Sequence, residues 1–203
     1  MKYKIIIKML RNRVIWFDLE TGGLNPFHHP IIEIAALDNF GNAFQSLLRI
    51  DKPLDPKVVQ ITKITDELLQ TEGRDYDSVI HDFHKYISGG DLRSNHRTFM
   101  IAHNGDSFDR MFIKTAFKNV HLSVPNNIYF IDSLHLARMV MPERTSYKQE
   151  YLAEKFRIKN PNPHRAMGDV LVLQSIWDCM AELFGSKNNG RNDIIAIYNA
   201  IYF

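Results

Sequence analysis

The sequence contains little cysteine and no long hydrophobic run. Cys179 is the single cysteine among 203 residues. One thiol can form neither an internal disulfide nor a cysteine-rich zinc site, so we expect a reducing, intracellular setting in the cytoplasm or nucleus. No apolar stretch approaches the roughly 20 residues that a membrane-spanning helix needs. The basic N-terminus also lacks the apolar length of a signal peptide, so we expect neither secretion nor a membrane partner.

The chain also lacks a strong excess of either charge. Its net charge is +2 and its pI is about 8.6, which is too mild a balance to indicate nucleic-acid binding by itself. A basic group near the N-terminus could contact phosphates, although a solvated edge is the more common role of such a group: Lys2, Lys4, Lys8, Arg11 and Arg13. Length and an ordinary content of hydrophobic residues, 45%, favour one globular domain.

The hydrophobic pattern predicts strands first and then strands that alternate with helices. Strands are expected at 14–20, 31–37, 43–50, 98–103 and 128–131, with a hairpin turn at 39–42. Helical spacing begins near Lys57, a further helix is expected to start at Thr65 as N-cap, and others are expected at 77–87, 108–120, 133–139, 146–156, 165–184 and 193–201. This order predicts an α/β fold with a mixed central sheet flanked by helices.

Four acidic residues and one histidine stand in matching structural contexts. Asp18 and Glu20 lie two residues apart at the end of an apolar strand, so both side chains point to the same face. The carboxyl ends of strands are where α/β sheets place ligand sites. Asp109 falls in the first turn of the helix after a later strand, and Asp169 falls in the first turn or two of another helix, five residues after His164.

Such a set of acids has a definite chemistry if its members meet in space. Clustered carboxylates resist ionisation beside one another, and divalent cations relieve that repulsion. Oxygen ligands without a thiolate favour Mg²⁺ or Mn²⁺ over zinc. Two such ions about 4 Å apart can bind the attacking water and the leaving oxygen of a phosphodiester. His164 could accept the proton of that water, a role that typically contributes a factor of about 10²–10⁴.

The motifs together resemble those of the DEDDh exonucleases, the DnaQ-like 3′→5′ exonuclease family of the ribonuclease H-like fold. The resemblance is carried by Phe17–Thr21, His103–Asp109 and His164–Asp169. Two stretches look most like the three-prime repair exonucleases, namely Ala102–Asp109 and His164–Leu171. The resemblance covers roughly 12–184. It implies a single exonuclease domain with extensions at 1–11 and 185–203, and a sheet of three antiparallel strands followed by parallel ones.

The resemblance also implies a role for each site residue. Asp18, Glu20 and Asp169 would bind one Mg²⁺ or Mn²⁺, Asp18 and Asp109 would bind a second, and His164 would be the general base. The expected substrate contacts are Glu20, Thr21, Gly22, Leu24, Ile64, Thr65, His103, Phe108 and His164. Core packing is an equally good interpretation of Leu24, Ile64 and Phe108. The products would be nucleoside 5′-monophosphates.

Several alternatives remain open at this stage. Single-stranded or frayed DNA is slightly favoured as substrate over RNA. The pairs Gly22–Gly23 and Thr62–Lys63 depart from the family pattern at sugar contacts, and so bear on that choice. A non-catalytic nucleic-acid-binding module is another alternative. The loss of one acid would have supported it, but all four acids and His164 are present. A zinc hydrolase lacks its His-Glu-x-x-His helix here. Three-prime repair enzymes are commonly dimers, which allows a homodimer.

Overall fold

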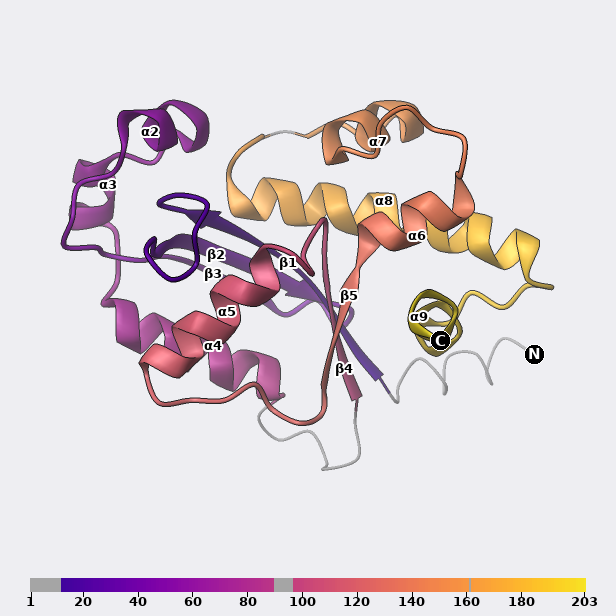
Figure 1. Ribbon diagram of the computed structural model, residues 1–203, viewed down its shortest axis with the longest axis horizontal. Coiled ribbons are helices and arrows are strands. Elements are labelled where there is room, and N and C mark those ends of the chain that lie inside the picture. The colour runs from indigo at the N-terminus through magenta and orange to yellow at the C-terminus, as the bar shows by residue number, and fades with distance from the viewer. Residues whose placement is uncertain (1–11, 90–96, 161) are drawn as a thin grey trace.

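The protein is represented by a computed structural model that describes residues 12–89, 97–160 and 162–203. The expected 1–11 extension, with Lys2, Lys4, Lys8 and Arg11, lies outside the described residues. Within them the strands are β1 (Asn12–Thr21), β2 (Ile31–Asp38), β3 (Ala43–Leu47), β4 (Arg97–Ala102) and β5 (Ile128–Asp132). They form one sheet in the order β3-β2-β1-β4-β5 (Figure 1). The first three strands pair antiparallel and β1, β4 and β5 pair parallel, so the predicted mixed sheet is confirmed.

Helices follow the strands much as the sequence predicts. They are α2 (Pro56–Thr62), α3 (Asp66–Thr71), α4 (Tyr76–Ser88), α5 (Asp109–Asn119), α6 (Ser133–Val140), α7 (Gln149–Phe156), α8 (Ala166–Lys187) and α9 (Ile194–Tyr202). Thr65 is the N-cap of α3, as predicted, and its hydroxyl accepts a hydrogen bond from the Leu68 N–H. Such caps satisfy backbone donors that the first helical turn leaves free.

Most element ends lie within two residues of the prediction, but β3, α7 and α8 each have one end that differs by more, and α8 continues to Lys187 rather than ending at Phe184. β3 ends at Leu47 rather than at Ile50, because the chain leaves the sheet there and pairs with Arg74, whose N–H donates to the Leu47 carbonyl at 3.0 Å. α7 begins at Gln149 rather than at Ser146. The preceding backbone is held outside a helix, since the Tyr147 carbonyl accepts a hydrogen bond from His103.

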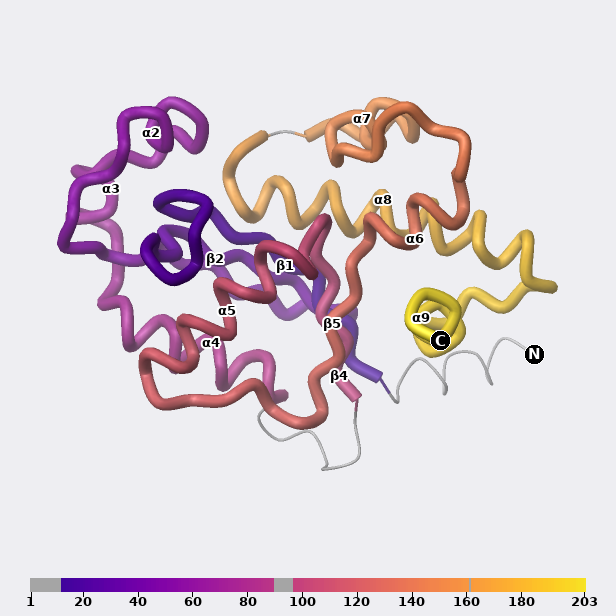
Figure 2. Tube along the Cα trace, viewed as in Figure 1, coloured from indigo at the N-terminus to yellow at the C-terminus, as the bar shows by residue number. Residues whose placement is uncertain are grey.

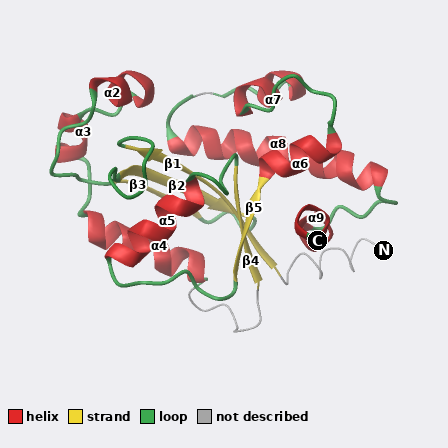
Figure 3. Ribbon diagram, in the orientation of Figure 1, coloured by secondary structure: helices red, strands yellow, loops and turns green. Residues whose placement is uncertain are grey.

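Helices cover both faces of the sheet (Figures 1 and 3). On one face, α8 packs in a hydrophobic cluster that contains Trp16 of β1. On the other face, α4 and α5 pack against Ile15 and Phe17. Because side chains alternate along a strand, Asp18 and Glu20 continue the Trp16 side and emerge on the face that carries α8.

The C-terminal segment folds back onto this body. Ile197 of α9 is 1% exposed and belongs to the α8-side cluster. Figure 2 shows α9 running next to α6, which it contacts. The expected 185–203 extension therefore contributes to the core. No helix in the described part of the chain has both the length and the hydrophobicity to cross a bilayer.

Candidate active site

The four predicted acids come together at the carboxyl end of β1. Carboxylate oxygens of Asp18, Glu20 and Asp169 lie within 4.8 Å of one another. Asp109, the first residue of α5, is 5% exposed, and its carboxylate accepts a hydrogen bond from the Leu19 backbone. Its charge acts on Asp18 more strongly than that of any other acid. A strand and two helix starts thus build one acidic centre, which we call the acid cluster.

Burial and mutual repulsion oppose ionisation of the acid cluster. Burial raises the pKa of Asp18 well above its ordinary value, and the charges of Asp109, Glu20 and Asp169 raise it further. Burial, followed by the charges of Asp169, Glu33 and Asp109, raises the pKa of Glu20 to about 8. Burial raises the pKa of Asp109 to about 7 and also raises that of Asp169. A cation that binds this cluster would therefore displace protons from it.

Asp169 is held by hydrogen bonds to both of its carboxylate oxygens. Its Oδ1 accepts from the Asn160 side-chain amide at 2.7 Å and its Oδ2 from the His164 backbone N–H at 3.0 Å. Gly168 allows this arrangement, because a Cβ there would lie 2.3 Å from the Asn162 carbonyl oxygen. The loop before α8 can therefore lie directly on the first turn of the helix.

His164 lies beside the acids with its side chain free. The residue is exposed and adopts a left-handed backbone, with φ of 59°. It lines an open cleft of about 740 Å³ together with Asp18, Glu20 and Asp169. Its imidazole forms no hydrogen bond with any residue that the structure describes. The ring is thus available to a water molecule or a substrate.

His103 also lines the cleft, but both of its ring nitrogens are engaged. Nε2 donates to the Tyr147 carbonyl at 2.7 Å, so in the neutral ring Nδ1 accepts from the Ser133 hydroxyl at 2.8 Å. Burial lowers the pKa of His103 and favours that neutral form. This histidine joins β4 to the segment before α7, and only its ring face remains for a substrate.

The other expected substrate contacts do not line the cleft. Leu24 is 83% exposed on the β1–β2 connection, whereas Ile64 is fully buried among core side chains. Phe108 is half-buried with its ring centroid 4.8 Å from that of Phe112. The Thr21 hydroxyl donates to the Gly23 carbonyl at 2.8 Å, and Gly22 between them is buried. Thr65 is exposed at the start of α3. Their substrate roles stay predictions.

The cleft has a far wall that the sequence analysis missed. It comes from α6 and from the connection into α7, and includes Arg138, Ser146, Lys148, Gln149 and Glu150. The Gln149 side chain donates to the Asp169 carbonyl at 3.0 Å and ties this wall to α8. Nothing in the local sequence pattern marked these residues, because they face the acids only through the tertiary fold.

Glu33 is a further acid that the sequence analysis missed. It is fully buried on β2, directly opposite Glu20 of β1, and forms an ion pair with Arg165 at 3.1 Å. A glutamate within the apolar run of β2 was the available signal, since an ionisable group is rarely buried without a partner.

A second group, Asp106, Asp132 and His135, also has potential ligand atoms within 4.8 Å of one another. The Asp132 carboxylate, however, accepts hydrogen bonds from the backbone N–H groups of Asn104, Asp106 and Leu134. This acid holds the β4–α5 loop, which leads to Asp109, and caps α6.

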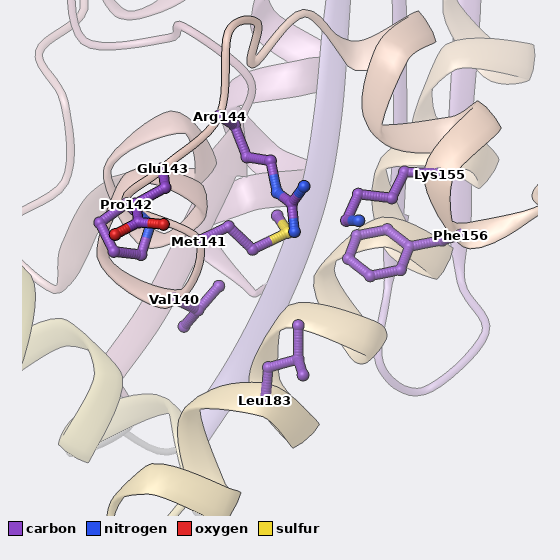
Figure 4. Close-up of a pocket in the computed structure, with 8 residues that line it drawn as sticks. All are labelled: Val140, Met141, Pro142, Glu143, Arg144, Lys155, Phe156 and Leu183. Atoms are coloured by element: carbon purple, nitrogen blue, oxygen red, sulfur yellow. The ribbon is translucent and has the colours of Figure 1, made fainter.

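Figure 4 shows a separate hollow of about 510 Å³ that lacks the acid cluster. Val140, Met141, Phe156 and Leu183 form its apolar part, and the side chains of Arg144 and Lys155 point toward one another beside them. It contains no group that could take part in chemistry at the acid cluster.

The fold and the acid cluster are those of an enzyme that hydrolyses nucleic acid. The sequence profile of the RNase T exonuclease family matches residues 15–176. The chain belongs to this family of DnaQ-like exonucleases with the ribonuclease H-like fold, as the three motifs indicate.

Relatives and solved structures agree with this assignment. The chain is 34% identical over 171 residues to the PolC-type DNA polymerase III of Bacillus subtilis, covering 80% of this chain and 11% of the polymerase. It is 31% identical over 176 residues to the chloroplastic/mitochondrial exonuclease DPD1 of Arabidopsis thaliana, covering 81% of this chain and 54% of that protein. The chain thus spans only part of each relative.

Among solved structures, E. coli exonuclease I in complex with a dA16 oligonucleotide superposes with a TM-score of 0.74 at 19% identity. That match covers 93% of this chain and 42% of exonuclease I. At this identity it supports the fold.

Proposed function

We propose that this chain is a metal-dependent 3′→5′ exonuclease that releases nucleoside 5′-monophosphates from single-stranded or frayed DNA. The observation that carries the proposal is the meeting of Asp18, Glu20 and Asp169, with ligand atoms within 4.8 Å, in a cleft that also contains the free imidazole of His164. This arrangement combines a cation-binding group with a candidate base at one open surface.

The donor set of the acid cluster fits Mg²⁺ or Mn²⁺. Every candidate ligand is a carboxylate oxygen, which these hard cations prefer. Asp18, Glu20 and Asp169 would hold one ion, and Asp18 with Asp109 a second. When bound, such ions lower the pKa of a water molecule and neutralise charge on the leaving 3′ oxygen.

The protein's own groups would position the base and carry away its proton. The His164 N–H donates to Asp169, so the residue that would bind the cation also fixes the backbone of the base. The imidazole would accept the proton of the attacking water. Because His164 is exposed, that proton can then leave to solvent.

The far wall of the cleft supports a nucleic-acid substrate. Arg138 and Lys148 are exposed there, opposite the acids, and can neutralise the phosphates of a strand that runs along the cleft. Exonuclease I has been crystallised with single-stranded oligonucleotides, and the PolC relative is a DNA polymerase by name, which favours single-stranded DNA for this chain.

Product analysis on matched DNA and RNA oligonucleotides with a 5′ label tests the proposal. With Mg²⁺ we expect a ladder of products shortened stepwise from the 3′ end, faster on DNA, and no products in EDTA. A labelled mononucleotide as the first product would reverse the polarity. Faster cleavage of RNA would assign the chain to RNA trimming, and absence of cleavage with a folded protein would contradict the hydrolytic role.

A further inference from the structure

We infer that the ion pair between the buried Glu33 and the half-buried Arg165 positions the acid cluster, because it sets the distance from Asp169 of α8 to the acids of β1. The inference rests on the proposed function. It concerns Glu33 of β2 and Arg165 at the start of α8, which have no place among the expected metal ligands or substrate contacts. We call them the strand–helix pair.

Four hydrogen bonds saturate the Glu33 carboxylate. Arg165 donates through Nε to Oε2 at 3.2 Å and through Nη2 to Oε1 at 3.1 Å. The Ala166 N–H donates to Oε2 at 3.1 Å, and the Gln45 side-chain amide donates to Oε1 at 3.0 Å. Each oxygen therefore has two donors, and neither is left to bind a cation.

This saturation explains how Glu33 can be buried so close to other acids. A buried carboxylate is costly unless it is paired and hydrogen-bonded. The planar guanidinium of Arg165 matches both carboxylate oxygens at once, which fixes direction as well as distance. Arg165 also lowers the pKa of Glu20, so its charge reaches the acid cluster.

The position of the strand–helix pair links the elements that carry the ligands. Glu33 is in register with Glu20 on the neighbouring strand. Arg165 is the N-cap of α8, and Asp169 lies in the first turn of that helix. The pair therefore sets how far Asp169 stands from Asp18 and Glu20. It also fixes the chain next to His164, whose N–H is bonded to Asp169.

The test removes the pair without changing the net charge near the acids. In the double variant Glu33→Gln/Arg165→Gln no buried charge is left unpaired. Removal of groups that orient metal ligands typically costs about 10–100-fold in metal affinity or activity. We therefore expect Mn²⁺, titrated into the metal-free protein by calorimetry, to bind about 10–100-fold more weakly. We also expect kcat to fall more than KM rises.

The chain offers a matched control at the far end of β2, the strand that carries Glu33. Arg13 and Asp38 form a buried ion pair between β1 and β2 at 2.9 Å. The variant Arg13→Gln/Asp38→Asn should lose stability to a similar degree and keep the wild-type Mn²⁺ affinity. A purely structural role of the strand–helix pair predicts the same behaviour in both double variants.

A milder substitution keeps the test decisive if the double variant does not fold. Arg165→Lys retains the charge but loses the bidentate hydrogen bond to Glu33. We therefore expect a loss of Mn²⁺ affinity between that of the wild-type protein and that of the double variant. Unchanged Mn²⁺ affinity in a folded variant of the strand–helix pair would overturn the inference alone. Failure of the wild-type protein to bind Mn²⁺ would instead overturn the proposed function.

Discussion

At the scale of single residues, the acids in and beside the cleft differ in the hydrogen bonds that hold their carboxylates. Asp169 accepts two hydrogen bonds and Glu33 accepts four, whereas burial dominates the behaviour of Asp18 and Glu20. Acids of the last kind favour their protonated forms when no cation is bound. The stability of the metal-free protein should therefore depend on pH in a range where ordinary carboxyl groups are already ionised.

We expect the metal-free protein to lose stability as the pH rises. The folded pKa is about 8 for Glu20 and about 7 for Asp109, against ordinary carboxyl values near 4. Between these values the folded state binds more protons than the unfolded state, so the free energy of unfolding falls as the pH rises through this window. Urea unfolding in EDTA at about pH 5 and about pH 8 measures the change.

The variant Glu20→Gln is the control for this pH dependence, and it should flatten the decline. A free energy of unfolding that rises across the window in the wild-type protein, and equally in Glu20→Gln, would show that the acid cluster ionises freely.

His164→Ala should slow hydrolysis by about 10²–10⁴ and leave Mn²⁺ binding nearly unchanged. The reason is that the imidazole is free in the cleft, while Asp169 is bonded to the His164 backbone rather than to its ring. Single-turnover cleavage with Mg²⁺ measures the effect. His121→Ala is a matched control, because His121 is also exposed and also has a φ of 59°. A loss of only a few-fold would remove His164 from the role of base.

The sequence predicts a site residue when the neighbouring residues in the chain already mark its position. Asp18 and Glu20 stand at a strand end, and Asp109 and Asp169 stand at helix starts, so the sequence places each without tertiary information. Arg138 and Lys148 reach the cleft only through the packing of α6 and α7. Ile64 sits in a segment that matches a family motif, but the packing of β2 and α3 around it buries its side chain.

At the scale of elements, α9 is joined to the loop that delivers Asp109. The Tyr202 hydroxyl accepts a hydrogen bond from the Asp132 N–H at 3.0 Å and donates to Asp106 at 3.1 Å. Asp132 in turn accepts from two backbone N–H groups of the β4–α5 loop. The last helix therefore supports the active-site loop through one hydroxyl.

Tyr202→Phe should lower the free energy of unfolding by about 1–3 kcal/mol, because the buried Asp132 N–H loses its acceptor. Urea denaturation measures this loss. Tyr198→Phe is the control, since the Tyr198 hydroxyl bonds no residue in the described part of the chain. Equal effects of the two substitutions would show that ring packing, and not the hydroxyl, accounts for the contribution of α9.

The ends of β3 and α7 show that the hydrophobic periodicity of the sequence does not determine where an element ends. The hydrophobic pattern continues past Leu47 and therefore predicts a longer β3. The strand ends there because the backbone at its end pairs with Arg74: the Arg74 N–H donates to the Leu47 carbonyl, and the Arg49 N–H donates to the Arg74 carbonyl. The start of α7 moves for a similar reason, since His103 binds the Tyr147 carbonyl. Both corrections come from residues distant in sequence, which a local pattern cannot reveal.

At the scale of the whole molecule, the cleft exists because strand pairing changes from antiparallel to parallel at β1. Antiparallel strands lie on one side of β1 and parallel strands on the other, so β1, α5 and α8 can all contribute acids at one end. The order of the elements along the chain predicts this arrangement. The register of Glu20 with Glu33, and thus the link to α8, emerges only once the strands are paired.

The most direct test of this account measures Asp18→Asn in two ways on one preparation. Burial and the charges of four neighbouring acids all oppose ionisation of Asp18, so removal of its charge should leave the unfolding temperature in EDTA unchanged or raised. The stabilisation that Mn²⁺ gives to the wild-type protein, and hydrolysis of a labelled DNA strand with Mg²⁺, should both be lost. If Asp18→Asn keeps its Mn²⁺ stabilisation and cleaves at the wild-type rate, the acid cluster is not the catalytic centre.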